Sequence, residues 1–413
     1  MLTRRTRQED TNPAYRLDMP DTNEYYFSLS QRFKLAKYVV FLSLILFIVF
    51  MVTGYGEEIT VENLRYLLKY MDTQQGSVSE NYTDFRYDVV DGADFHLYKG
   101  DLVVSGTDGF DIYDINGKHI LNAKYEYLNP TLLVSEQYIL VYDLGGNSFS
   151  LYNSFGLLYE ETLNYPIGCA SIGDTGNFLI VTRAKEYRSV VYCYNKDFKR
   201  IYSWHSSDKY VLSATMDPLG SQFVIAASTV SDRGYFRTEV LICNPNSEDK
   251  KAQKSFDDEA VIASGFFADQ SYVLLSDKAM YLFDSFHAQK AQYTYPASAS
   301  PSAFYYSEQT GHTMLAFHEN VVGNESSVIF LNASGETVYQ GTVEGDICDV
   351  KFGTQTAYIL TDDTIRMVDL TFARHVDYSP SQNPKKLFPI SSDLLLVCYP
   401  SVTEVKNINE IFF

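Results

Sequence analysis

The segment GFDIYDINGKHI, Gly109–Ile120, is the clearest indication of the fold: an apolar strand ends at Asp114, a polar turn follows and an apolar run resumes. The same strand–turn phrase returns seven times further along the chain. Its copies are SFSLYNSFGLLY (148–159), SVVYCYNKDFKRI (189–201), TEVLICNPNSEDKKA (238–252), AMYLFDSFHAQKA (279–291), SVIFLNASGETVY (327–339), TIRMVDLTFARHV (364–376) and EVKNINEIFF (404–413). The copies start roughly 35–50 residues apart, and such a period indicates one repeated structural unit.

A second phrase precedes several copies of the first. DTGNFLIV, Asp174–Val181, and DPLGSQFVIA, Asp217–Ala226, read as tight hairpins that enter a buried strand. The other copies are KGDLVVSG, EQYILVYD, DQSYVLLS, GHTMLAFH, TQTAYILT and SSDLLLVC. Each unit therefore carries four strands, and wholly apolar second strands are typical of the inner layers of packed sheets. Units of this length and content predict an all-β fold, a β-propeller.

The two ends of the repeat predict how the ring closes. The eighth unit stops at Phe413 after its third strand, and a strand-like run, NYTDFRYDVV (81–90), precedes the first unit near Gly92. That run can supply the missing outer strand, which leaves fewer exposed strand edges. We therefore predict an eight-bladed β-propeller, with seven blades as the alternative if a loop-rich unit such as 208–258 is divided wrongly.

An apolar run, YVVFLSLILFIVFMVTGY (Tyr38–Tyr55), lies ahead of the repeat and contains no charged residue. As a helix it is roughly 27 Å long, enough to cross the bilayer core. Lys34 and Lys37 precede it and Glu57 and Glu58 follow it, so the positive-inside rule places the N-terminus in the cytoplasm and the remainder outside. The alternatives are a buried core helix and a cleaved signal peptide. An uncleaved signal anchor fits best, because about 37 residues precede the run and no small-residue cleavage site follows it.

These features divide the chain into four segments. They are a disordered cytoplasmic tail (1–37), a transmembrane helix (38–55), a stalk (56–81) and an extracytoplasmic β-propeller (82–413). In the stalk, apolar residues recur at helical spacing from Thr60 to Met71 and predict a short amphipathic helix. This helix would pack on the propeller or form a dimer or partner interface.

The charges differ between the tail and the rest of the chain. Residues 1–37 carry a net charge of +2, whereas residues 38–413 carry 26 basic and 47 acidic residues, a net charge of −21. An exterior this acidic argues against nucleic acid as a partner.

The repeat over 82–413 resembles the WD40-like, TolB-like and quinoprotein-like β-propellers, and the hairpins at Asp174 and Asp217 carry the likeness to the TolB-like kind. The layout of basic tail, single span and propeller resembles membrane-anchored propeller proteins of Gram-positive anaerobes, a domain-of-unknown-function family. The chain departs from two of these patterns. No Trp-Asp pair marks its blades, and Trp204 alone cannot supply the tryptophan motifs of the quinone-binding enzymes.

The sequence predicts no catalytic residue, no cofactor-binding residue and no metal ligand. Its seven histidines show no metal-binding spacing, and neither a nucleophile elbow nor a phosphate-binding loop is present. The acidic run Asp111–Gly117 does not fit the calcium-loop spacing and reads as a strand end with its turn. A catalytic site made of carboxylates that meet across blades at the central channel is an alternative, because sequence spacing does not specify which blades bring their side chains together.

Five cysteines, Cys169, Cys193, Cys243, Cys348 and Cys398, lie in apolar, strand-like contexts without tight spacing. We expect small buried side chains rather than a disulfide framework.

The function that this layout favours is a non-catalytic scaffold for protein interactions in the cell membrane. Tyr38–Tyr55 would contact the lipid bilayer, and the propeller loops would bind protein partners in envelope assembly, secretion or division. The cytoplasmic tail offers a second contact. The alternative is an enzyme or small-ligand sensor with its site at the mouth of the central channel. Acidic, His or Arg side chains that face the channel and converge in a pocket would favour this alternative over the scaffold.

Overall fold

The computed structural model describes residues 22–55, 84–88, 92–230, 234–247, 250–296, 300–318 and 325–412. It divides into two compact units, residues 1–78 and 79–413. The first contains helix α1 (Thr22–Tyr55). Residues 22–37 are helical where the sequence predicted a disordered tail, because an existing helix extends without the cost of a new nucleus. The amphipathic helix predicted from Thr60 to Met71 lies outside the described residues.

The membrane span is not confirmed. Within the part of the chain that the structure describes, no helix combines the length and the apolarity that crossing a bilayer requires.

The second unit contains eight four-stranded sheets, which are the blades of the propeller. Blade 1 contains β2 (Asp94–Tyr98), β3 (Asp101–Ser105), β4 (Gly109–Tyr113) and β5 (His119–Lys124), and blade 2 contains β6 (Pro130–Val134), β7 (Ile139–Asp143), β8 (Ser148–Asn153) and β9 (Gly156–Thr162). Blade 3 contains β10 (Cys169–Ile172), β11 (Phe178–Ala184), β12 (Tyr187–Tyr194) and β13 (Arg200–Ser206), and blade 4 contains β14 (Tyr210–Met216), β15 (Phe223–Val230), β16 (Phe236–Cys243) and β17 (Lys250–Asp257).

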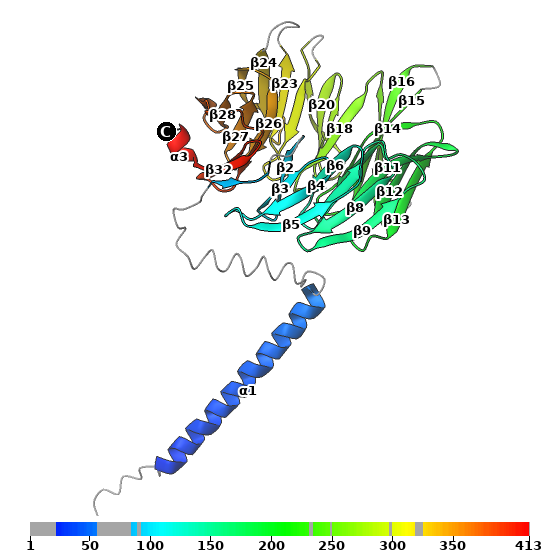
Figure 1. Ribbon diagram of the computed structural model, residues 1–413. Coiled ribbons are helices and arrows are strands. Elements are labelled where there is room, and N and C mark those ends of the chain that lie inside the picture. Colours follow the sequence, from blue (N-terminus) through cyan, green and yellow to red (C-terminus); the bar gives the residue numbers. More distant parts are fainter. Residues whose placement is uncertain are drawn as a thin grey trace, which may run out of the picture. The chain divides into compact units, whose positions relative to one another are not determined.

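The remaining blades follow the same order. Blade 5 contains β18 (Val261–Phe266), β19 (Tyr272–Ser276), β20 (Ala279–Phe283) and β21 (Gln289–Thr294), and blade 6 contains β22 (Ala303–Tyr306), β23 (Thr313–His318), β24 (Glu325–Leu331) and β25 (Thr337–Glu344). Blade 7 contains β26 (Ile347–Phe352), β27 (Thr356–Thr361), β28 (Ile365–Asp369) and β29 (Arg374–Tyr378), and blade 8 contains β30 (Lys386–Pro389), β31 (Leu394–Cys398), β32 (Val402–Asn407) and β1 (Phe85–Arg86). The blades follow one another in sequence order around the ring (Figure 1), and this confirms the prediction of eight blades rather than seven.

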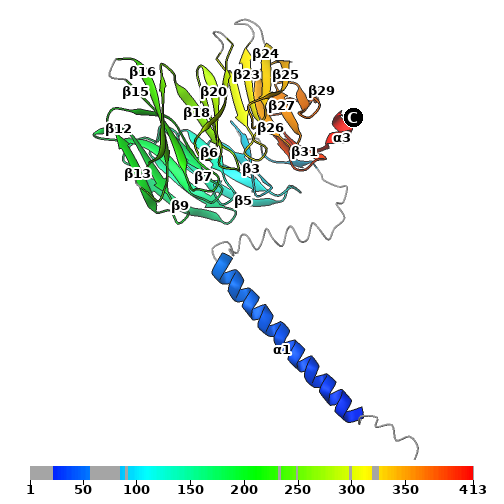
Figure 2. The same ribbon diagram turned by 180° about the vertical axis from the view of Figure 1, so that it is seen from behind.

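Strand β1 closes the ring as the outer strand of blade 8, as the sequence predicted. Phe85 pairs with Thr403 and Arg86 with Val402, so the two ends of the propeller share one sheet. Figure 2 shows this junction from behind, next to the C-terminal helix. The Tyr87 hydroxyl donates to the carbonyl oxygens of Tyr399 and Val402 and accepts from Thr403, which fixes the closing strand to blade 8.

The chain alternates between two faces of the ring, because neighbouring strands of each blade are antiparallel. The turns from first to second strand and from third to fourth strand lie on one face, which we call the hairpin face. The turns from second to third strand and the links between blades lie on the other, which we call the connection face.

An Asp or Asn that ends the third strand caps the turn after it in every blade. In blade 1, the Asp114 carboxylate accepts hydrogen bonds from the amides of Asn116 and Lys118, at 2.9 and 2.8 Å. Asn153, Asn195, Asn244, Asp284, Asn332, Asp369 and Asn407 do the same in the other blades. In blade 8 the capped segment continues as helix α3 (Ile408–Phe412) instead of a fourth strand. The sequence did not predict this helix.

The core lies between the blades. Every residue of β7 and of β19 is buried, as expected for second strands packed on both faces. The fourth strands are more exposed, and from Lys251 to Asp257 in β17 exposed residues alternate with half-buried ones. The rings of Phe178 and Tyr194 stack with their centroids 4.7 Å apart, in the core between blades 2 and 3. Burying one such side chain stabilises the fold by about 1.5–3 kcal/mol.

Candidate docking face and ring axis

A pocket of about 610 Å³ lies on the connection face where blades 2, 3 and 4 meet. Its lining comes from the turn at Leu144–Gly145, the link at Pro166–Gly168, the two arms of the β11–β12 hairpin (Val181–Arg183 and Arg188–Ser189) and the start of β14 (Tyr210–Val211). This volume is within the range of small-molecule and side-chain binding pockets. We call it the connection-face pocket.

Backbone hydrogen bonds fix the walls of this pocket. Gly145 N donates to Ile167 O at 2.9 Å, and Ile167 N donates to Gly146 O at 2.7 Å. The Thr182 hydroxyl, which is buried, donates to the carbonyl oxygens of Tyr165 and Pro166 at 3.0 and 2.9 Å. The link between blades 2 and 3 is therefore held on both sides, so the pocket is formed before any partner binds.

Two arginines line the pocket from blade 3. Arg188 Nη1 donates to the Tyr210 hydroxyl at 2.6 Å, and its guanidinium carbon lies 5.0 Å from the centroid of the Tyr210 ring. Arg183 is exposed. Among the described residues, neither arginine forms an ion pair with a carboxylate. Both positive charges are therefore available to a ligand.

Large apolar side chains are exposed along the same face. They adjoin its turns and links from blade 1 to blade 5, and each is at least 40% exposed: Leu128, Leu144, Tyr187, Tyr210, Val230, Tyr235, Phe236 and Ile262. Tyrosine, phenylalanine and arginine are the residue types enriched in the cores of protein interfaces. We call this set, with the pocket, the docking face.

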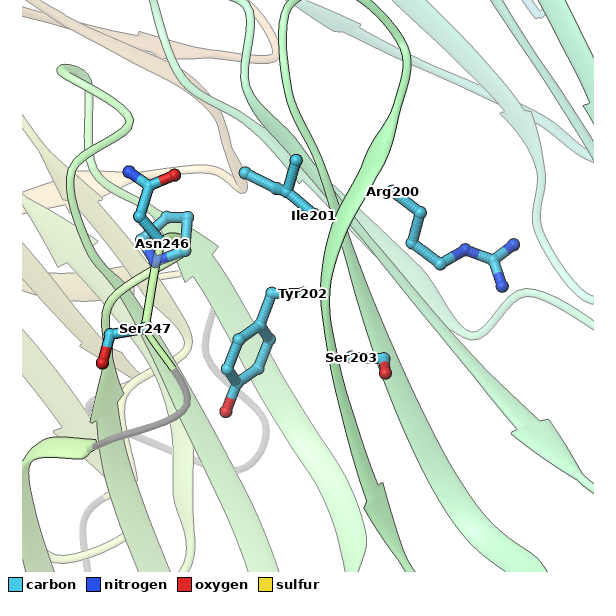
Figure 3. Close-up of a pocket in the computed structure, with 7 residues that line it drawn as sticks. Arg200, Ile201, Tyr202, Ser203, Asn246 and Ser247 are labelled. Carbon is cyan, nitrogen blue, oxygen red and sulfur yellow. The ribbon is translucent and has the colours of Figure 1, made fainter.

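A second pocket, of about 520 Å³, lies on the hairpin face between β13 and the β16–β17 turn. Figure 3 shows Tyr202 on the same side of the strand as Asn246 and Ser247, whereas Arg200 points to the other side. There Arg200 forms an ion pair with Glu161 at 3.0 Å and lies 3.7 Å from the centroid of the Tyr192 ring. Because its charge is already compensated by Glu161, Arg200 is a poor anchor for an anionic ligand.

Three carboxylates from different blades interact near the ring axis. Glu136, Asp174 and Glu308 lie in the first hairpins of blades 2, 3 and 6, on the hairpin face. Burial, together with the negative charges of Asp174 and Glu136, raises the pKa of Glu308 to about 7. The Tyr306 ring packs against Gly265, where an added Cβ would come within 2.4 Å of the ring.

The structure thus places together carboxylates that the sequence could not place. In the described residues, no group of three His, Cys, Asp or Glu side chains is arranged to hold a metal ion. A missed signal for the docking face was the run Arg183-Ala-Lys-Glu-Tyr-Arg188, which is basic within an acidic chain.

The cysteines correct one expectation. All five are free, and Cys193, Cys243 and Cys398 are buried, but Cys348 is exposed. A bulge in the pairing of β26 with β27 skips Cys348 between Ile347 and Asp349, so its side chain is not enclosed by the sheet.

Comparisons with known proteins bear on the fold. A family described as "Family of unknown function (DUF5711)" matches residues 73–406. No curated protein matches the chain significantly.

Solved structures resemble the chain at low identity. The dihydro-heme d1 dehydrogenase NirN in complex with DHE has a TM-score of 0.56 and 14% identity, over 76% of this chain and 72% of that chain. BamB from Moraxella catarrhalis has a TM-score of 0.51 and 8% identity, over 79% and 97%. A structure of the eukaryotic initiation factor has a TM-score of 0.53 and 11% identity, over 82% and 88%. Identities this low show the propeller fold alone.

Proposed function

Given that the chain belongs to the DUF5711 family, a family of unknown function, we propose that it is a non-catalytic scaffold that binds protein partners through its docking face. The observation that carries this proposal is the set of exposed tyrosine, phenylalanine and aliphatic side chains along the connection face. Exposed apolar residues beside a pocket mark interaction sites, because leaving them in water is unfavourable. The hairpin face also exposes large apolar side chains, such as Phe155, Leu219 and Phe286, so it is the pocket with its two arginines that singles out the connection face.

Site-specific photo-crosslinking tests the proposal. A photoreactive amino acid replaces Tyr187 or Tyr235 on the connection face, or Phe286 or Phe372 in exposed turns of the hairpin face. We expect the same protein to be crosslinked from both connection-face positions and from neither control position. Crosslinks that are absent everywhere, or equal from both faces, would overturn the proposal.

We also propose that Tyr38–Tyr55 anchors the scaffold in the cell membrane, with the tail in the cytoplasm and the propeller outside. The absence of charge from this run supports the proposal, as does the exposure of Val39, Val40, Phe41 and Leu42, each more than half exposed. The side chains of residues 47, 48 and 50–55 lie outside the described ones. Partners in envelope assembly, secretion or division would fit such a location.

The carboxylates at the ring axis favour a second candidate function, a site for a small ligand at the channel mouth. A carboxyl whose pKa is about 7, as for Glu308, can exchange a proton near neutral pH. Binding of a small ligand that is lost in Glu308→Gln, while crosslinking from Tyr235 is unchanged, would support this second function.

A further inference from the structure

We propose that the connection-face pocket binds an acidic segment of a partner protein, with carboxylates on Arg183 and Arg188 and an apolar side chain inserted between them. This inference rests on the proposed scaffold function and names the chemical class of its partner.

The charge around the pocket is the first argument. Residues 38–413 carry a net charge of −21, yet Arg183, Lys185 and Arg188 lie within six residues that contain one acid, Glu186. All four side chains are exposed on the β11–β12 hairpin. A basic island in an acidic surface attracts an acidic segment locally, while the surrounding charge repels the same segment from other sites.

The geometry of Arg188 is the second argument. Its hydrogen bond and ring contact with Tyr210 hold the guanidinium at the pocket and leave its other N–H groups able to donate. A guanidinium matches a carboxylate with two parallel hydrogen bonds. An arginine already held in place loses less side-chain entropy when a ligand binds.

The apolar part of the pocket is the third argument. Ile167 and Val181 form its floor, at 1% and 5% exposure, and Leu144 and Tyr210 stand exposed at its rim. A purely polar ligand would leave this apolar surface exposed to water. We therefore expect the acidic partner segment to carry an apolar residue beside its acidic residues. Gly168 keeps one wall open, since a Cβ added there would meet only Val181 O, at 3.8 Å.

The experiment is a selection of random twelve-residue peptides displayed on phage against the purified full chain. We expect enrichment of peptides that combine acidic residues with a central aromatic or aliphatic residue. The most enriched peptide, labelled with a fluorophore, is then titrated by anisotropy against the full chain and its variants. Replacing its acids with Asn and Gln should weaken binding at least about tenfold, as should replacing its apolar residue with Ser.

Two variants locate the peptide. Arg183→Glu with Arg188→Glu should weaken binding by at least about tenfold, because it reverses both charges. Gly168→Phe should also weaken binding, because it fills the pocket without touching either charge. Lys199→Glu, an exposed turn residue on the hairpin face of the same blade, is the matched control and should change binding less than about twofold.

The outcomes distinguish a failure of this inference from a failure of the proposed scaffold function. Enrichment of basic or neutral peptides, absence of any enriched peptide, or binding unaffected by the arginine variant would overturn the inference. If crosslinking from Tyr187 and Tyr235 still succeeds in that case, the scaffold stands with a different partner chemistry. If crosslinking also fails, the scaffold itself is wrong.

Discussion

At the scale of single residues, the repeat is produced by one hydrogen-bonding pattern. An Asp or Asn at the end of each third strand accepts the amides of the following turn, as Asp284 does from Phe286 and Ala288 at 2.9 and 2.8 Å. These residue types favour such turns because their short side chains reach the backbone two residues on. Asn407 accepts from the Asn409 amide at 3.0 Å in the same way, but there the chain turns into helix α3.

Tyr87→Phe removes the hydroxyl that joins the closing strand to blade 8. Its partners, the carbonyls of Tyr399 and Val402 and the Thr403 hydroxyl, are then left in a buried position. We expect the free energy of unfolding to fall by about 1–3 kcal/mol, measured by urea denaturation. Tyr187→Phe is the control, because that side chain is exposed, and it should change stability by less than about 0.5 kcal/mol.

Glu308→Gln should change how stability depends on pH. The pKa of Glu308 is raised from 4.5 to about 7 in the folded chain, so the folded state binds a proton that the unfolded state releases in this interval. The stability that this carboxyl contributes is therefore lost as the pH rises from about 4.5 to about 7, and the loss is complete above about pH 7. We expect the variant to be more stable than the parent at pH 8, with the difference shrinking toward pH 5.

The control for this pH dependence is Glu126→Gln, at an exposed position in the link between blades 1 and 2. It removes the same charge and should show no difference that depends on pH in this interval. Thermal melting of both variants at several pH values measures the effect, and a Glu308→Gln difference that is constant with pH would contradict it.

At the scale of elements, the two-residue strand β1 decides whether the ring is closed. It covers the edge of β32. The Phe85 side chain packs directly against Gly117 of blade 1, and a Cβ added at Gly117 would come within 2.2 Å of it, so only glycine fits there. Without β1 the backbone edge of β32 would be open to pairing with another chain.

A chain that starts at residue 92 lacks β1, whereas one that starts at residue 80 retains it. We expect the shorter chain to aggregate and to melt at a lower temperature, while the longer chain stays monomeric by size-exclusion chromatography. Equal solubility and melting temperature of the two would show that the ring does not depend on this strand.

At the scale of the whole molecule, the proposed topology predicts which cysteines a membrane-impermeant maleimide reaches in intact cells. In a Cys348→Ser background, which removes the exposed thiol, we expect Lys199→Cys in the propeller to be labelled directly. Thr11→Cys in the tail should be labelled only after the membrane is permeabilised. The reverse pattern would mean that the chain is oriented with its propeller in the cytoplasm.

The architecture of the propeller could be predicted from the amino-acid sequence alone. Strand periodicity, turn residues and repeat spacing are local properties, so eight units and a closing strand near Phe85 could be predicted without coordinates. The start of α1 and the helix α3 could not, because helix ends depend on weak propensities that a neighbouring element can override.

Which residues meet depends on the three-dimensional fold. Arg188 reaches Tyr210 in the next blade, and the charges of Glu136 and Asp174 act on Glu308 in a blade far along the chain. No sequence spacing specifies such pairs, because the closing of the ring sets the distances between blades. Closure also assigns each turn to one of two faces, and so it brings Tyr187, Tyr210, Tyr235, Arg183 and Arg188 to the face proposed here for docking.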